Sequence, residues 1–132
     1  DSPRSTGYQA PGGHQVIRSA DGTLGGGSME SALSASANTA FAEIAIRTGE
    51  LALREMASRV SSVPDRSGNL TTEPITLGPG ALDPDAVARS GFGQQGVRAT
   101  PLAIAVLGAH VAGGAEVADP RILRGRCHGE VF

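Results

Sequence analysis

The chain has 132 residues and a formal net charge of −2, and 39% of its residues are apolar but only 3% aromatic. This length fits one domain or part of one, and the near-neutral charge gives no electrostatic argument for binding nucleic acid or an anionic membrane. The sequence predicts no membrane span, because no apolar run approaches the ~18 residues that one requires, and it shows no signal peptide. A single cysteine, Cys127, excludes an internal disulfide and a cysteine-based metal cluster.

The basic residues carry a second exclusion. All eleven are arginines, and lysine is absent. An arginine guanidinium keeps its proton at any working pH, so it cannot replace a lysine that acts as a general base. A mechanism that needs an amine base is therefore closed to this chain by itself.

The first half of the chain predicts a loop-rich arm followed by three helices. Residues 1–27 are rich in glycine and form the expected arm, with a short strand only near residues 15–17. The first helix covers residues 28–35. The second covers 39–48, with Asn38 as its N-cap, and the third covers 50–60.

The second half predicts a long loop and two further helices. Residues 61–82 are rich in proline and glycine and leave room for a short strand at 73–77. Asp83, followed by a proline, caps a short helix. The run 100–114 begins with Thr-Pro, ends with Gly-Gly and is apolar on nearly every side, so we expect a buried central helix. Residues 117–124 are expected to be extended.

The order of these elements predicts a mostly α fold with long loops and at most one or two short strands. We place the domain boundary between the arm, residues 1–27, and a helical domain at residues 28–132. No spacing of the three histidines and the cysteine suggests a metal site.

Two polar side chains stand out just before the second helix. Asn38 is a typical N-cap residue, and Ser36 lies two residues earlier, in the bend that leads to it. The first-turn amides at a helix N-terminus are unpaired and favour negative charge. The pattern thus presents a hydroxyl and an amide side by side at a site that favours an anion. From the local sequence alone, plain helix capping is the favoured interpretation.

The run Ser36-Ala37-Asn38-Thr39 resembles the Ser-x-Asn motif of penicillin-binding proteins, and is most similar to that of the actinobacterial class B transpeptidases. A second block, residues 91–120, resembles another part of this family, with a glycine–glutamine turn at Gly93-Gln94 and a Thr-Pro-Leu helix start. Two such blocks in the order found in the family are a more specific sign of resemblance than either block alone. The resemblance implies the helical subdomain of the penicillin-binding protein/β-lactamase-like fold, from the middle of a transpeptidase domain.

The same resemblance implies roles for individual residues. Ser36 would relay protons near a nucleophile, and Asn38 would hold the substrate or a bound β-lactam, with Thr39, Gly93 and Gln94 as further substrate-binding residues. Acyl transfer needs both a proton path and a positioned donor. The family's Ser-x-x-Lys motif, which carries the nucleophile, and its Lys-Thr-Gly motif are absent, so we expect the chain to begin after the first and to end before the second. No cofactor is implied.

Three functions stay open. In the slightly favoured one, the chain is a piece of a split or processed peptidoglycan transpeptidase in the cell envelope, and a companion segment supplies nucleophile and base to a peptide or β-lactam-like ligand. In the second, it is a free-standing cytoplasmic remnant that binds a small ligand or acts in biosynthesis, with a homodimer covering its exposed surface. In the third, it is a non-catalytic interaction module in which Ser36 and Asn38 are only caps.

Overall fold

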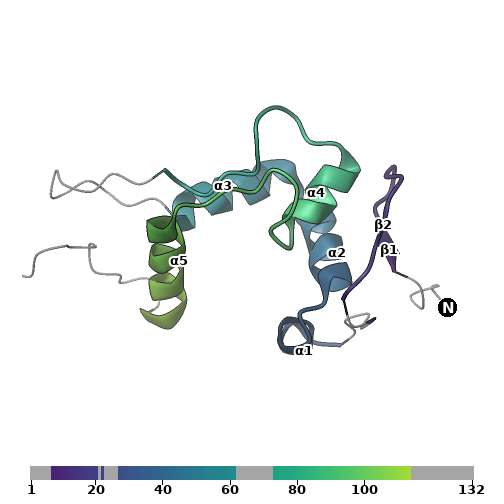
Figure 1. Cartoon of the computed structure of the whole chain (residues 1–132), viewed down its shortest axis with the longest axis horizontal. Coiled ribbons are helices and arrows are strands. Elements are labelled where there is room, and N and C mark those ends of the chain that lie inside the picture. The colour runs from purple at the N-terminus through teal and green to yellow at the C-terminus, as the bar shows by residue number, and fades with distance from the viewer. Residues whose placement is uncertain (1–6, 21, 23–26, 62–72, 114–132) are drawn as a thin grey trace, which may run out of the picture. The chain divides into compact units, whose positions relative to one another are not determined.

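The computed structural model describes residues 7–20, 22, 27–61 and 73–113. Within them the chain forms two short strands and five helices, which are shown in Figure 1. In order, these are β1 (Tyr8–Gln9), β2 (Val16–Ile17), α1 (Met29–Ser34), α2 (Asn38–Thr48), α3 (Glu50–Ser61), α4 (Pro84–Ser90) and α5 (Pro101–Gly113). The prediction of a mostly α fold with at most two short strands is confirmed. The extended segment expected at 117–124 lies outside the described residues.

Three of the predicted helix starts are confirmed by their capping hydrogen bonds. The Ser28 hydroxyl accepts the backbone N–H of Ser31 at 3.1 Å at the start of α1. At the start of α4, a carboxylate oxygen of Asp83 accepts the backbone N–H of Ala86 at 2.7 Å. At the start of α5, the Thr100 hydroxyl accepts the backbone N–H of Ala103 at 3.1 Å. Each bond satisfies an N–H that has no partner within its helix.

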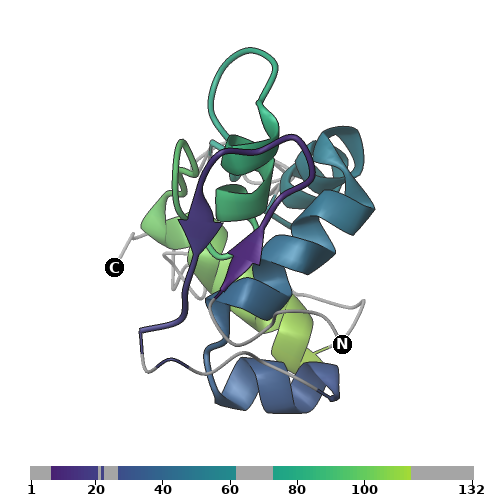
Figure 2. The same cartoon turned by 90° about the vertical axis from the view of Figure 1, so that its right-hand side faces the viewer.

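The chain divides into two compact units. One comprises Asp1–Met56 and Thr76–Arg98, and the other comprises Ala57–Ile75 and Ala99–Phe132. In the first unit, β1 and β2 form an antiparallel hairpin in which Tyr8 pairs with Ile17 (Figure 2). The sequence predicts β2, in which Val16 and Ile17 are both β-branched, but not β1, in which a polar Gln9 follows Tyr8.

The core of the first unit lies where the hairpin and α4 pack against α2. Its fully buried members are small or β-branched, and three larger side chains pack against them from the rim. The buried members are Ala10, Ile17, Ala42 and Ala88, and the rim residues are Tyr8, Ile46 and Phe92. With few aromatic residues available, close approach of the backbones replaces bulky side chains as the means of filling space.

Residues 73–83, the described part of the connection between α3 and α4, pair briefly with the segment after α4. Thr76 and Arg98 exchange two backbone hydrogen bonds of 2.9 Å each. The strand expected at 73–77 is therefore an isolated bridge rather than a strand.

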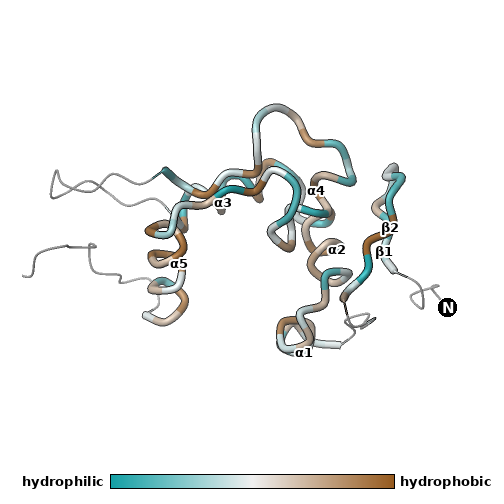
Figure 3. The backbone as a smooth tube through the Cα atoms, viewed as in Figure 1, coloured by the Kyte–Doolittle hydropathy of each residue, from teal (hydrophilic) through white to brown (hydrophobic). Residues whose placement is uncertain are grey.

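In the second unit, α5 forms where predicted but is not buried. Only Ala103 and Val106 of this helix are buried, whereas 52% of Ile104 and 81% of Val111 remain exposed. Figure 3 shows hydrophobic colouring along α5. The expectation of a buried central helix is thus wrong for the described structure, because apolar composition predicts a preference for burial but supplies no neighbour to provide it.

None of the helices within the described residues is both long and apolar enough to cross a membrane.

Candidate functional site

The α1–α2 corner, residues 35–38, contains the serine and asparagine singled out above. The N–H of Ser36 donates to the carbonyl of Leu33 at 3.0 Å, and the N–H of Ala37 donates to the carbonyl of Ala32 at 2.9 Å. These two bonds are the pair that defines a Schellman motif, with Ser36 at the position that is usually glycine. Ser36 accordingly has a φ of 50°, in the left-handed region. A side chain in that region costs about 1 kcal/mol.

The surroundings of Ser36 leave its hydroxyl at the surface. Ser36 is exposed, whereas Ala37 is fully buried and Thr39 is 5% exposed. Within the described part of the chain, the Ser36 hydroxyl makes no hydrogen bond. The corner therefore holds a hydroxyl in a strained backbone position directly before α2, where it is available to an external partner.

Asn38 does not cap α2, and this corrects the prediction. The helix begins at Asn38 itself, and its N-cap is Ala37, which has no side-chain cap hydrogen bond. The side-chain nitrogen of Asn38 instead donates to the backbone carbonyl of Arg18 at 3.2 Å. A residue already inside the first turn cannot turn its side chain back to the first-turn amides, and the chain leaving β2 supplies a carbonyl within reach.

The turn that carries Gly93 and Gln94 follows directly after α4. Gly93 has a φ of 80°, and the N–H of Gln94 donates to the carbonyl of Arg89 at 3.1 Å. A second hydrogen bond joins the same two residues, because the Arg89 guanidinium donates to the side-chain amide oxygen of Gln94 at 3.3 Å. Gly93 and Gln94 are both exposed.

Packing brings this turn to the helix that starts at the α1–α2 corner. Gly91 lies against the backbone of Phe41, which follows Asn38 by three residues, or about 4.5 Å along the axis of α2. No hydrogen bond among the described residues joins Ser36 or Asn38 to Gly93 or Gln94. The two blocks thus meet on α2 without direct polar contact.

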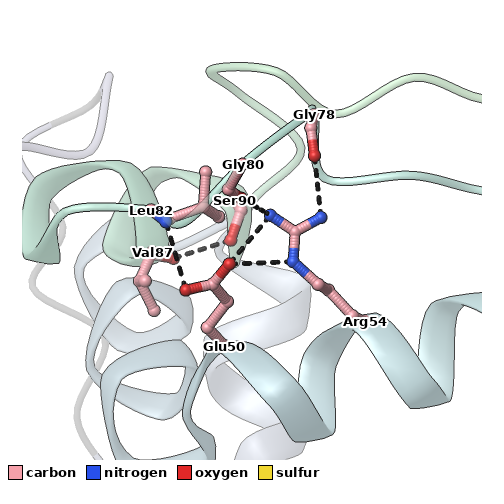
Figure 4. A network of polar contacts seen from close by, with 7 residues as sticks. All are labelled: Glu50, Arg54, Gly78, Gly80, Leu82, Val87 and Ser90. Carbon is pink, nitrogen blue, oxygen red and sulfur yellow. Dashed lines mark hydrogen bonds and ion pairs between the residues drawn. The ribbon is translucent and has the colours of Figure 1, made fainter.

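A second polar cluster, shown in Figure 4, holds the loop before α4. Arg54 on α3 donates to the carbonyls of Gly78 and Gly80, at 2.7 Å each, and pairs with Glu50 at 2.8 Å. The other oxygen of Glu50 accepts the N–H of Leu82 at 3.1 Å. The Leu82 N–H and then the Arg54 guanidinium hold the pKa of Glu50 below its ordinary value. Each nitrogen of the Arg54 guanidinium and the N–H of Leu82 already has an acceptor, which indicates a structural role.

Two other groups bear on the corner and are not among the predicted site residues: the carbonyl of Arg18 and the carboxylate of Asp85. Asp85 accepts backbone hydrogen bonds from His14 and Gln15, some seventy residues earlier in the chain. No local pattern could have indicated either group, because one is a backbone atom and the other contacts a distant loop. Among the described residues, no three His, Cys, Asp or Glu side chains are placed to hold a metal ion.

In sequence, the chain is similar to peptidoglycan D,D-transpeptidase PbpA of Mycobacterium tuberculosis. The chain is 37% identical to this protein over 97 residues, or 73% of its own length, in both strain CDC 1551 / Oshkosh and strain ATCC 25618 / H37Rv. It spans 20% of the length of these relatives. No protein-family model and no solved structure matches. The likeness supports a relationship to penicillin-binding proteins, over about a fifth of the length of the transpeptidase.

Proposed function

We propose that this chain contributes the Ser-x-Asn edge of a peptidoglycan transpeptidase cleft and that a companion segment supplies the nucleophile and its base. The likeness to a protein named as a peptidoglycan D,D-transpeptidase supports this proposal. The observation that carries it is Ser36, held at a φ of 50° with an exposed hydroxyl immediately before α2. Backbone strain of this kind is concentrated at functional sites.

The corner offers two complementary groups for acyl transfer. The Ser36 hydroxyl both donates and accepts hydrogen bonds, so it can pass a proton between a nucleophile and a leaving group. Asn38 uses one N–H on Arg18 and retains a second for the carbonyl of a peptide or β-lactam. Thr39, Gly93 and Gln94 would complete this side of the cleft, and the N-terminus of α2 favours negative charge developing near it.

The absence of lysine supports the companion segment. A serine nucleophile needs an adjacent base to take its proton, and this sequence contains no lysine. The companion, whether continuous with this chain or a separate polypeptide, would carry the Ser-x-x-Lys and Lys-Thr-Gly motifs.

The test is acylation by a fluorescent penicillin, read by gel and intact mass. The chain alone should remain unlabelled, and a mixture with a segment that carries both missing motifs should become labelled on the companion. Ser36→Ala should slow labelling by about 10²–10⁴-fold, the usual contribution of a positioned proton relay.

The matched control is Ser34→Ala. Ser34 lies on the exposed side of α1, two residues away, and donates to the Ser31 carbonyl at 3.1 Å. This variant should leave the labelling rate unchanged. Equal effects of the two variants, or no labelling with any companion, would overturn the proposal. A homodimer that binds a small ligand without a companion would favour the free-standing alternative instead.

A further inference from the structure

We infer that Asp85 is a positioning residue for Asn38. Its carboxylate holds the hairpin loop, residues 10–15, and the hairpin in turn holds the carbonyl that orients the Asn38 amide. The contacts that link Asp85 to Asn38 are seen in the structure. Only the expected effect on acylation rests on the proposed function.

The first link joins α4 to the hairpin loop. One oxygen of Asp85 accepts the N–H of His14 at 2.7 Å, and the other accepts the N–H of Gln15 at 3.3 Å. The Gln15 side chain also accepts a hydrogen bond from the Arg89 guanidinium, one turn further along α4. Hydrogen bonds to a charged carboxylate are stronger than those between neutral groups, so the loop is held at two points on one face of α4.

The loop approaches so closely that a side chain in place of Gly13 would displace the carboxylate. A Cβ on Gly13 would overlap an Asp85 oxygen and lie 3.0 Å from the carboxyl carbon. The φ of Gly13 is not in the left-handed region. The glycine at this position is therefore explained by the space that Asp85 occupies rather than by backbone conformation.

The second link runs from the loop to Arg18. Gln15 leads directly into β2, in which Ile17 pairs with Tyr8 and is 4% exposed in the core. Arg18 is the next residue. Only Val16 and Ile17 lie between Gln15 and Arg18, and Ile17 is held in the core, so a shift of the loop on α4 has two residues of extended chain over which to be absorbed before it reaches the Arg18 carbonyl.

The third link decides which way the Asn38 amide faces. A backbone carbonyl can only accept, so the atom of Asn38 that faces Arg18 must be the nitrogen. This leaves the amide oxygen and one N–H for partners outside the hairpin. Without the carbonyl, the amide is free to rotate by half a turn and exchange the donor for the acceptor. The hairpin thereby selects the amide orientation that the Ser-x-Asn edge presents.

The direct test follows the two side-chain N–H signals of Asn38 by NMR in the full chain, assigned by their loss in Asn38→Asp. Asp85→Ala should shift these signals and speed their exchange with solvent at least tenfold. Gly13→Ala should do the same, because its methyl group displaces the carboxylate without removing the charge. Asp85→Asn, which keeps an acceptor oxygen for the loop, should restore the wild-type signals in part.

The matched control is Asp83→Ala, which removes the cap of α4 but no bond to the hairpin. It should weaken α4 and leave the Asn38 signals unchanged. Equal shifts in Asp83→Ala and Asp85→Ala would overturn the inference, because loss of α4 stability alone would then explain them. Unchanged signals in Asp85→Ala and Gly13→Ala would overturn it as well.

The acylation assay separates this inference from the proposed function. If both hold, Asp85→Ala and Asn38→Ala should each slow labelling, and the double variant should be no slower than Asn38→Ala, since both changes act through one amide. If the Asn38 signals shift but Asn38→Ala labels at the wild-type rate, the proposed function fails and the positioning link stands. An additional loss in the double variant would overturn the claim that Asp85 acts through Asn38.

Discussion

Gly91 lies so close to α2 that a methyl group on it would overlap the carbonyl oxygen of Phe41 and stand 2.6 Å from the Cβ of Ala45. Gly91 is also the C-cap of α4, and its N–H donates to the Ala88 carbonyl at 3.3 Å. The contact between α2 and α4 therefore depends on the absence of a side chain at one position. It is also the contact that brings the Gly93–Gln94 turn to α2.

Gly91→Ala should destabilise the first unit. The added methyl group must push α4 away from a backbone atom that cannot move independently, and overpacking of this kind costs about 1–3 kcal/mol. Hydrogen exchange should show lower protection of the α2 amides. Gly108→Ala is the matched control, because a Cβ there meets nothing within 4 Å. Alanine is preferred over glycine within a helix by up to about 1 kcal/mol, so this variant should protect α5. Equal protection losses in both variants would contradict the packing argument.

Ser36→Gly should raise the free energy of unfolding by about 0.5–1 kcal/mol, because glycine adopts a positive φ without the penalty that a Cβ brings. Ser36→Ala keeps that penalty, so its stability should differ from wild type by less than about 0.5 kcal/mol. Urea denaturation followed by circular dichroism measures both. The proposed function adds that both variants slow the labelling of the companion by penicillin. A stability loss in Ser36→Gly would argue against the strained corner.

Arg54→Ala should release the loop at residues 78–80 from α3. The side chain donates to two backbone carbonyls there, and hydrogen bonds from a charged group are each worth about 1.5–3 kcal/mol. Hydrogen exchange and urea denaturation should both report the loss. Arg54→Lys should recover only part of it, since an ammonium group lacks the planar fork that spans two acceptors. Arg47→Ala is the control: it breaks only an exposed 3.6 Å pair with Glu43, and its stability should stay within about 0.5 kcal/mol of wild type.

Glu50 should make stability depend on pH in the acid range. The Leu82 N–H and the Arg54 guanidinium favour the charged carboxylate in the folded state and lower its pKa. The stabilisation is therefore complete above the unfolded-state pKa, near ~4.3, and is lost as the pH falls through the lower folded-state value. Urea midpoints measured from pH 6 to pH 3 should fall less steeply in Glu50→Gln than in wild type.

Arg54→Ala offers a graded check on the same carboxylate. It should weaken the pH dependence without abolishing it, because the larger cause, the Leu82 N–H, remains. Parallel curves for wild type and Glu50→Gln would show that this carboxylate does not contribute.

The local features of the fold could be predicted from the residues alone. Caps at Ser28, Asp83 and Thr100 were correct because a cap bond spans three residues and depends on little else. The bend at Ser36 was also expected, and the structure adds its left-handed backbone. The boundary between the arm and the helical domain stays a prediction, as do the ligand-binding roles of Ser36, Asn38, Thr39, Gly93 and Gln94.

The features that could not be predicted all depend on residues far apart in the chain. Asn38 has the composition of a cap, yet its side chain donates to a carbonyl twenty residues earlier. The apolar pattern of α5 predicted a helix correctly and its burial wrongly, because burial requires a neighbour that the pattern does not contain.

By itself, then, the sequence determined where α1, α4 and α5 start, that the chain contains no lysine, and that a hydroxyl and an amide lie on either side of Ala37. Only the tertiary structure decided which way that amide faces and how closely α4 approaches α2. Both features depend on backbone atoms that packing brings together. Because every residue has a backbone carbonyl, the residue type does not indicate which carbonyl is contacted.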